Sequence, residues 1–197
     1  LSGLANAAQD SSARFSLGPS DRVLQVSPLG FDVSLGDWAA SLWSGCTLLF
    51  APPAALRDPR ELFALLVSSR ASVLLSITPT LLSALLDAAG EEGLRASALR
   101  LAVMVGEPPT ANLCRRFYRC APPGARLYNR YGPSEATQAS TLWLVPSAED
   151  LAGPVPAGRP IPGVSIWLLD RFLNPVPFGS RGEICIAGPH VAQGYHN

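Results

Sequence analysis

Apolar residues in the first 145 positions alternate between two patterns, short unbroken runs and longer stretches at helical spacing. Unbroken runs of four or five apolar residues are typical of strands buried on both faces of a sheet. Stretches with apolar positions three or four apart are typical of helices that cover such a sheet. The pattern predicts an α/β fold with strands at 23–26, 47–50, 73–76, 101–105 and 126–128.

Three helix starts are marked by polar residues just ahead of apolar stretches. Asp58 precedes Pro59, and Pro is favoured in the first turn of a helix. Thr78 and Thr110 stand in equivalent positions before later helices, where a hydroxyl can cap free backbone N–H groups. Gly90 is the expected stop of the helix that Thr78 begins.

The character of the chain changes after Pro146, because prolines interrupt every potential helix. Short apolar segments remain at 164–169 and 183–187. We therefore predict two units, an α/β core over residues 1–145 and a portion rich in antiparallel β-structure over residues 146–197.

Charge and composition exclude several classes of partner. The 197 residues are 48% hydrophobic and carry 15 basic and 15 acidic side chains. With no net charge, the chain has no field that would attract nucleic acid or an anionic membrane. Every basic residue is Arg, so no catalytic lysine is available. We expect small molecules or other proteins as partners.

Cysteine spacing and hydropathy point to the cytoplasm. The four cysteines form no C-x-x-C pair, and neither His190 nor His196 stands at ligand spacing from them. Reduced thiols and no structural metal are expected, with both histidines at the surface. No apolar run is long enough to span a bilayer, and the start of the chain lacks the features of a signal peptide.

The segment Asn129-Arg130-Tyr131-Gly132-Pro133-Ser134-Glu135 resembles the adenine and magnesium motif of the adenylation domains of nonribosomal peptide synthetases, members of the acyl-adenylate-forming superfamily. Ser134 replaces the usual Thr and keeps the hydroxyl. Taken alone, the segment could be a simple turn. Three further segments agree in order with family motifs: Phe31-Asp32-Val33-Ser34, Val105-Gly106-Glu107, and residues 182–188 followed by Gly194-Tyr195.

This resemblance implies a fold and a reaction. The fold would be the layered sheet-and-helix core of the large N-terminal part of an adenylate-forming enzyme, followed by part of a β-barrel subdomain. The reaction would join an α-amino acid to ATP as an aminoacyl-adenylate, release pyrophosphate, and pass the aminoacyl group to the phosphopantetheine thiol of a carrier domain. ATP and Mg²⁺ would be required, with carrier and condensation domains as partners.

The resemblance also assigns nucleotide-site residues. Glu135 would bind magnesium, and the adjacent Ser134 would contact the α-phosphate, which makes these two the expected catalytic residues. Tyr131 would stack on adenine. The same pocket would be lined by Gly106, Glu107 and Asn129.

Substrate choice would centre on Asp32, which the resemblance pairs with the substrate ammonium group; the alternative is that Asp32 caps a helix beginning near Ser34. Gly36 replaces a bulkier residue of many relatives and would lengthen the pocket. Arg130 either faces the substrate or, in the interpretation we favour, points to solvent. The full implied wall is Asp32, Val33, Gly36, Ser76, Val103, Val105, Arg130, Gln138 and Ala139.

Several parts of the family pattern would lie outside the chain. The phosphate loop would end before Leu1, and the ribose-binding Asp and catalytic Lys would follow Asn197, so the isolated chain is expected to be inactive. Alternatives are an acyl-CoA synthetase, which has no need of Asp32, and a truncated ATP-binding fragment without catalysis. Trp38, Trp43 and Glu183 are interpreted as structural, the two tryptophans as core residues.

Overall fold

The apolar runs of the first 145 residues lie in one seven-stranded sheet in the computed structural model, which describes residues 2–146, 151 and 153–196. The strand order is β2-β1-β3-β4-β5-β6-β7. Strands β1 to β5 are parallel to one another, whereas β6 is antiparallel to both β5 and β7. The strands are β1 (Arg22–Gln25), β2 (Thr47–Phe50), β3 (Val73–Ile77), β4 (Leu101–Met104), β5 (Arg126–Tyr131), β6 (Thr141–Leu144) and β7 (Arg159–Pro160).

Three of the helices begin at the residues that the sequence marked. Asp58 accepts a hydrogen bond from the Arg60 amide, and Thr78 and Thr110 each cap a helix in the same way. Gly90 has a non-helical backbone (φ 67°, ψ −179°) that ends the helical stretch begun at Thr78, and a further short helical stretch of α5 follows it across a kink. The helices are α1 (Ser2–Phe15), α2 (Asp32–Ser44), α3 (Pro53–Arg57), α4 (Pro59–Ser68), α5 (Pro79–Gly93) and α6 (Ala111–Cys120), with short 3₁₀ turns η1 (Leu94–Ala96) and η2 (Ser134–Ala136).

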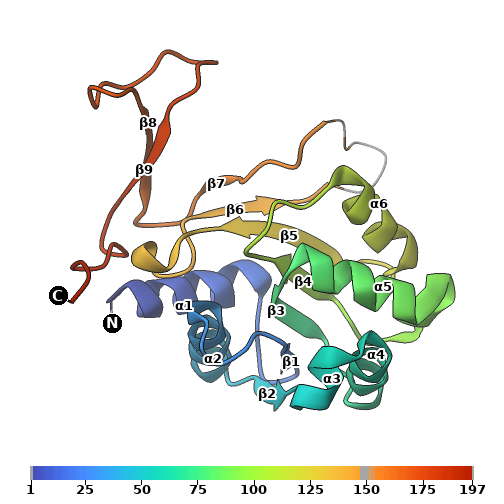
Figure 1. The fold of residues 1–197 in the computed structure, drawn as a ribbon. Helices are drawn as coiled ribbons and strands as arrows, with labels where there is room; N and C mark the ends of the chain where they lie inside the picture. Colours follow the sequence, from blue (N-terminus) through green and yellow to red (C-terminus); the bar gives the residue numbers. More distant parts are fainter. Residues whose placement is uncertain (1, 147–150, 152, 197) are drawn as a thin grey trace.

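Helices cover both faces of the sheet, which explains the unbroken apolar runs. Along β3, Val73 and Leu75 join the cluster beside α1 and α2, while Leu74 and Ile77 join the cluster beside α4, α5 and α6. Val73, Leu74 and Leu75 point alternately to the two faces. The alternation shifts before Ile77, where the pairing of β3 with β4 is irregular, and Ser76 donates a hydrogen bond to Asp37 of α2. Figure 1 shows the two helical layers on either side of the sheet.

The C-terminal portion is antiparallel, as predicted. Strands β8 (Ser165–Leu169) and β9 (Glu183–Ala187) form a two-stranded sheet of their own, which projects away from the main sheet in Figure 1. Strand β7, from the same portion, instead pairs with β6 in the main sheet. Among the described helices, none combines the length and the apolar character needed to cross a membrane.

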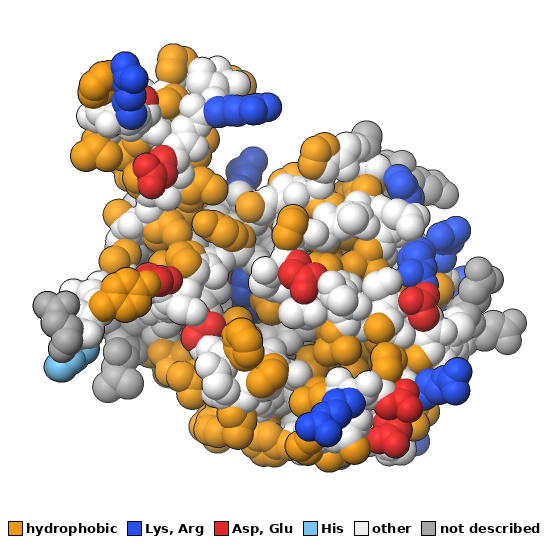
Figure 2. All heavy atoms as spheres, viewed as in Figure 1, with side chains coloured by type: hydrophobic (Ala, Val, Ile, Leu, Met, Phe, Trp, Pro, Cys, Tyr) orange, Lys and Arg blue, Asp and Glu red, His pale blue; other side chains and the backbone are white. Residues whose placement is uncertain are grey.

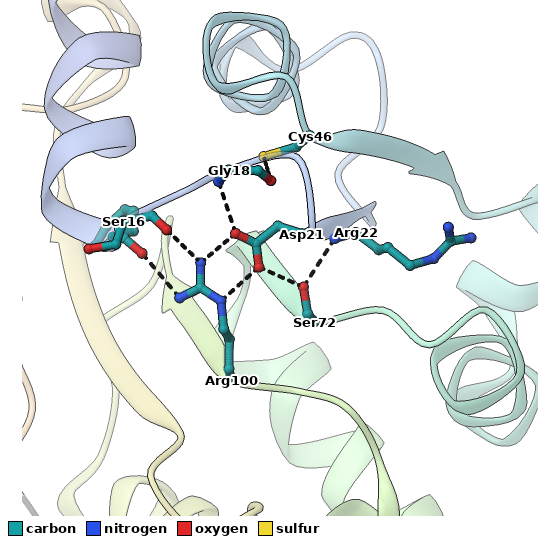
Figure 3. A network of polar contacts seen from close by, with 8 residues as sticks. Ser16, Gly18, Asp21, Arg22, Cys46, Ser72 and Arg100 are labelled. Atoms are coloured by element: carbon teal, nitrogen blue, oxygen red, sulfur yellow. Dashed lines mark hydrogen bonds and ion pairs between the residues drawn. The ribbon is translucent and has the colours of Figure 1, made fainter.

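A polar network ties the amino ends of three parallel strands together (Figure 3). Asp21, just before β1, accepts hydrogen bonds from the Arg100 guanidinium at 2.6 and 2.7 Å and from the Ser72 hydroxyl at 2.9 Å. Ser72 precedes β3 and Arg100 precedes β4. Arg100 also donates to the carbonyls of Phe15 and Ser16 at the end of α1, so the network fixes that helix to the sheet.

Apolar side chains are exposed over α2 and the edge strand β2, and Figure 2 shows them gathered there. Leu42 is 81% exposed, Trp43 57% and Phe50 59%. The prediction that Trp43 is a core residue is therefore wrong, because this side of α2 has no apolar element packed on it among the described residues. Trp38 is partly buried and packs edge-on against Phe50.

Candidate functional site

Loops at the carboxyl ends of the parallel strands build the candidate site. Open α/β sheets bind ligands at this edge, because the loops that leave successive strands converge there. The segments that follow β1, β3, β4 and β5 all contribute to one cavity of about 490 Å³. Its lining is Ser27, Pro28, Phe31, Asp32, Val33, Thr78, Val105, Gly106, Glu107, Arg130, Gly132, Pro133, Ser134 and Gln138. The polar network drawn in Figure 3 lies at the other end of these strands, because Asp21, Ser72 and Arg100 each precede a strand.

A second cavity of about 380 Å³ adjoins the first. The two share a wall made of Gly106, Glu107, Arg130, Gly132 and Pro133. The second cavity is otherwise lined by Pro108, Asn129, Tyr131, Val155 and Ala157. Two ligands, or two parts of one ligand, can therefore meet across a short wall.

Asp32 is the first residue of α2 and lines the larger cavity. Its Oδ1 accepts a hydrogen bond from the Val33 amide at 2.9 Å, whereas Oδ2 is buried without a partner among the described residues. The helix starts at Asp32 itself rather than near Ser34, and Phe31 occupies the N-cap position, so the capping alternative is wrong. A buried carboxylate oxygen without a donor is costly unless a ligand supplies one.

Arg130 does not point to solvent, so that interpretation is wrong. The residue is only 6% exposed, and its guanidinium donates to the Ser11 hydroxyl at 3.0 Å and lies over the Phe15 ring. Both partners belong to α1, more than 100 residues away in the sequence. Arg130 lines both cavities.

Four of the predicted pocket residues lie behind the cavity wall. Ser76, Val103 and Ala139 are buried and do not line the cavity as it stands. Gly36 does not lengthen the pocket, which corrects that expectation. The Gln138 amide occupies the space, because a Cβ added to Gly36 would lie 1.7 Å from Gln138 Nε2.

Asp37 is a neighbour of the cavity that the sequence pattern did not reveal. The residue is 1% exposed, and its Oδ1 accepts a hydrogen bond from the Ser76 hydroxyl at 2.6 Å. Burial raises the pKa of Asp37 to about 7, against the opposing effects of the Ser76 hydrogen bond and the Arg130 charge. Asp37 follows the predicted pocket residue Val33 by four positions, about one helical turn. This spacing is the sequence signal that could have identified Asp37.

The predicted nucleotide residues come together around the smaller cavity. Asn129 and Tyr131 lie on β5, and the Asn129 amide donates to the Pro156 carbonyl at 2.8 Å. Gly106 has φ 81°, a conformation that favours glycine. Glu107 accepts hydrogen bonds from the Thr80 amide and hydroxyl, which joins the β4 loop to the start of α5.

Ser134 and Glu135 lie at the rim, in the turn η2. Ser134 lines the larger cavity, and both residues line a neighbouring hollow together with Val191, Ala192, Gly194 and Tyr195. The Tyr195 hydroxyl donates to the Glu135 carboxylate and lowers the pKa of that carboxyl, assisted by the Glu135 backbone N–H. Glu135 is thus an exposed, ionised carboxylate at the cavity mouth.

The two histidines differ in exposure, so the expectation that both lie at the surface holds for one of them. His196 is exposed, but His190 is 1% exposed and therefore not a surface residue. Its Nε2 lies 2.6 Å from the Asn6 side-chain nitrogen on α1. Burial lowers the pKa of His190, which favours the neutral ring.

Cavity residues that the sequence motifs missed mostly follow strands. Ser27 and Pro28 follow β1, and Thr78 follows β3. The rule that ligands bind at the carboxyl ends of parallel strands would have identified them. Val155 and Ala157 come from the irregular segment before β7, where the sequence gives no comparable signal.

Comparison with known proteins identifies relatives along almost the whole chain. The sequence model of one protein family, described as "AMP-binding enzyme", matches residues 2–196. A linear gramicidin synthase protein of Brevibacillus parabrevis is 36% identical over 183 residues, 93% of this chain and 3% of that protein. Phosphinothricin tripeptide synthetase PhsB of Streptomyces viridochromogenes is 38% identical over 183 residues, 92% of this chain and 15% of that protein. The chain spans only a small part of these relatives.

Solved structures share the fold closely. A crystal structure of the nonribosomal peptide synthetase FmoA3 in an AMPPNP-bound form matches with a TM-score of 0.90 and 32% identity, over 98% of this chain and 21% of that chain. The same synthetase bound to α-methyl-L-serine-AMP matches with a TM-score of 0.90 and 33% identity, over 98% of this chain and 22% of that chain.

Proposed function

Since this chain belongs to the AMP-binding enzyme family, we propose that it carries the amino-acid and adenine pockets of an ATP-dependent ligase that activates an α-amino acid. The observation that carries the proposal is the pair of cavities separated by the shared wall of Gly106, Arg130 and Gly132. A carboxylate in one cavity and an α-phosphate from the other would meet beside Ser134.

In the proposed reaction, a carboxylate oxygen of the amino acid attacks the α-phosphorus of ATP. The bond from that phosphorus to the bridging oxygen of the β-phosphate breaks, and pyrophosphate leaves. Adenine would lie in the smaller cavity against Tyr131, with Gly106 permitting close approach of the backbone. The Ser134 hydroxyl would donate to an α-phosphate oxygen as charge develops there.

Glu135 is the residue that would bind Mg²⁺. Its exposed, ionised carboxylate suits a hard cation that takes one or two protein carboxylates and otherwise phosphate oxygens and waters. Among the described residues, no cluster of three His, Cys, Asp or Glu side chains could form a cage made of protein ligands alone. The ion, when bound, would neutralise phosphate charge.

Asp32 would select α-amino acids over other carboxylic acids. Asp32 lines the larger cavity, and its carboxylate would pair with a substrate ammonium group there. A fatty or aryl acid would leave this carboxylate unpaired, which argues against an acyl-CoA synthetase. The relatives are named as peptide synthetases and hybrid synthetases, so we further propose that the aminoacyl group passes to a carrier-domain phosphopantetheine thiol, with condensation domains in the same protein.

Exchange of labelled pyrophosphate into ATP by the complete protein tests this function. We expect exchange with amino acids and little with fatty or aryl acids. The Asp32→Ala variant should raise KM for amino acids by roughly 10- to 100-fold, the loss expected for an unpaired ammonium. Asp87→Ala, an exposed change on α5, is the control. No response to any amino acid would contradict the proposal, and equal losses for every carboxylate would assign Asp32 a structural role.

A further inference from the structure

The chain after β9 returns to the turn η2, which carries Glu135. In this segment, residues 189–195, the His190 carbonyl accepts a hydrogen bond from the Thr137 hydroxyl at 2.7 Å. The Ala192 amide donates to the Glu135 carbonyl, also at 2.7 Å. Thr137 and His190 are 53 residues apart in the sequence. A distant part of the chain therefore contacts the turn at two separate points of its backbone and side chains.

The turn η2 ends in a backbone conformation that needs support. Thr137 (φ 51°) and Gln138 (φ 58°) are both left-handed, a conformation that a β-branched residue such as Thr rarely adopts. Such a backbone persists only where neighbouring groups hold it. The Thr137 hydroxyl bonds to His190, whose ring is 1% exposed and lies against Asn6 of α1. The 189–195 segment therefore helps to fix the position of the turn.

Tyr195 reaches the side chain of Glu135 from the end of this segment. Its hydroxyl donates to Glu135 Oε1, and both residues line a hollow of about 280 Å³ that shares Ser134 with the larger cavity. Tyr195 is 83% exposed, so burial of its ring does little to hold it in place. A hydrogen bond, rather than packing, joins the two side chains.

A fixed carboxylate binds a metal ion better than a mobile one. An exposed Glu side chain samples many rotamers, and an ion that binds it must offset the entropy lost on ordering it. A hydrogen bond to one carboxylate oxygen reduces that freedom beforehand, as the outer partners of metal ligands do in general. Because a carboxylate has two accepting oxygens, the Tyr195 bond to Oε1 leaves Oε2 of the exposed Glu135 for an ion.

We propose that Tyr195 is a positioning residue for the metal site. Its hydroxyl holds Glu135 through Oε1 and leaves Oε2 available to Mg²⁺. The bonds of the 189–195 segment to the turn keep Tyr195 within reach of the carboxylate. This inference rests on the proposed function, because it takes Glu135 as the ligand of the ion.

Binding of the nucleotide analogue AMPPNP to the complete protein tests the inference without turnover. Equilibrium dialysis gives Kd in Mg²⁺ and in EDTA, and the ratio of the two is the gain in affinity that the ion supplies. Tyr195→Phe keeps the ring and removes the hydroxyl, so this gain should fall by roughly tenfold, while Kd in EDTA stays unchanged. The control Ser180→Ala removes an exposed hydroxyl between β8 and β9 and should leave the gain unchanged.

A second comparison assigns the effect to Glu135. Glu135→Ala should lower the gain from Mg²⁺. Adding Tyr195→Phe to that variant should lower the gain no further, because the hydroxyl then has no carboxylate to hold. A purely structural contribution of Tyr195 would instead weaken AMPPNP binding in both backgrounds and in EDTA.

The outcomes separate this inference from the proposed function. If Glu135→Ala lowers the gain but Tyr195→Phe leaves it unchanged or raises it, the inference is overturned and Glu135 stays the metal ligand. Equal losses from Tyr195→Phe with and without Glu135 would overturn it as well. A gain that Glu135→Ala does not change would remove Glu135 from the metal site, and this inference with it. Activation of amino acids is measured separately, by pyrophosphate exchange.

Discussion

At the scale of single residues, the carboxylates of the site differ in how exposed they are to solvent. Glu135 is exposed at the cavity mouth and ionised, whereas Asp32 and Asp37 lie deeper beside the larger cavity or beneath its wall. The position of each carboxylate follows from the element that carries it: η2 at the rim for Glu135, and α2 for the other two.

Replacement of Glu135 tests its metal role. We expect Glu135→Ala to reduce adenylate formation by at least roughly 100-fold, because it removes a carboxylate that would bind Mg²⁺ beside the phosphates. The fold should remain, since the side chain is exposed. Pyrophosphate exchange and circular dichroism measure the two effects.

The matched control is Glu183→Ala, which removes another exposed glutamate at the start of β9. It should leave exchange unchanged. Unaltered exchange in the Glu135 variant would remove this residue from the metal site.

At the scale of elements, the turn after β5 depends on a close backbone approach. A Cβ at Gly132 would lie 2.7 Å from the Ser140 amide nitrogen and 2.8 Å from the Gln138 carbonyl group, both backbone atoms that cannot move aside cheaply. Ser140 also donates its amide to the Tyr131 carbonyl, so a shift there would disturb the pairing of β5 with β6.

Gly132→Ala should therefore destabilise the protein by about 1–3 kcal/mol, the usual cost of inserting a group into packed surroundings. Gly30→Ala is the control, because a Cβ there meets nothing within 4 Å. Urea unfolding measures both. Equal stability of the two variants would show that the turn relaxes without strain.

At the scale of the whole molecule, the network around Asp21 joins α1, β1, β3 and β4. Burial of Asp21 acts to raise its pKa, but hydrogen bonds from Arg100, Ser72 and the Gly18 amide outweigh burial and lower the pKa. The folded protein then binds fewer protons at Asp21 than the unfolded chain does. Stability from this group is present above the unfolded pKa of about 4 and is lost as the pH falls through the lower folded pKa.

Asp21→Asn should cost about 1–3 kcal/mol at pH 7, because it weakens charged hydrogen bonds to a largely buried group. The cost should shrink as the pH falls below about 4. Urea titrations across pH measure it, with Asp87→Asn in an exposed ion pair as the control, expected to cost about 0–1 kcal/mol. A cost at Asp21 that does not change with pH would contradict the network's ionic character.

The fold was largely predictable because its signals are local. A capping residue or an apolar strand run determines structure within a few positions of itself. The structure confirms the predicted helix starts at Asp58 and Thr110. Burial of Arg130 and His190 was not predictable, because Ser11 and Asn6 come from α1 at the far end of the chain. Gln138 filling the space beside Gly36 likewise joins two segments about 100 residues apart.

The exposed apolar side chains of α2 and β2 have a consequence for handling the polypeptide. Leu42, Trp43 and Phe50 lie together beside a sheet edge whose outer backbone groups pair with no strand among the described residues. Such a surface promotes precipitation and strand-to-strand self-association when a polypeptide is concentrated. Recombinant preparations of these 197 residues alone will need solubilising substitutions on that face, such as Leu42→Lys, which leaves the cavity lining unchanged.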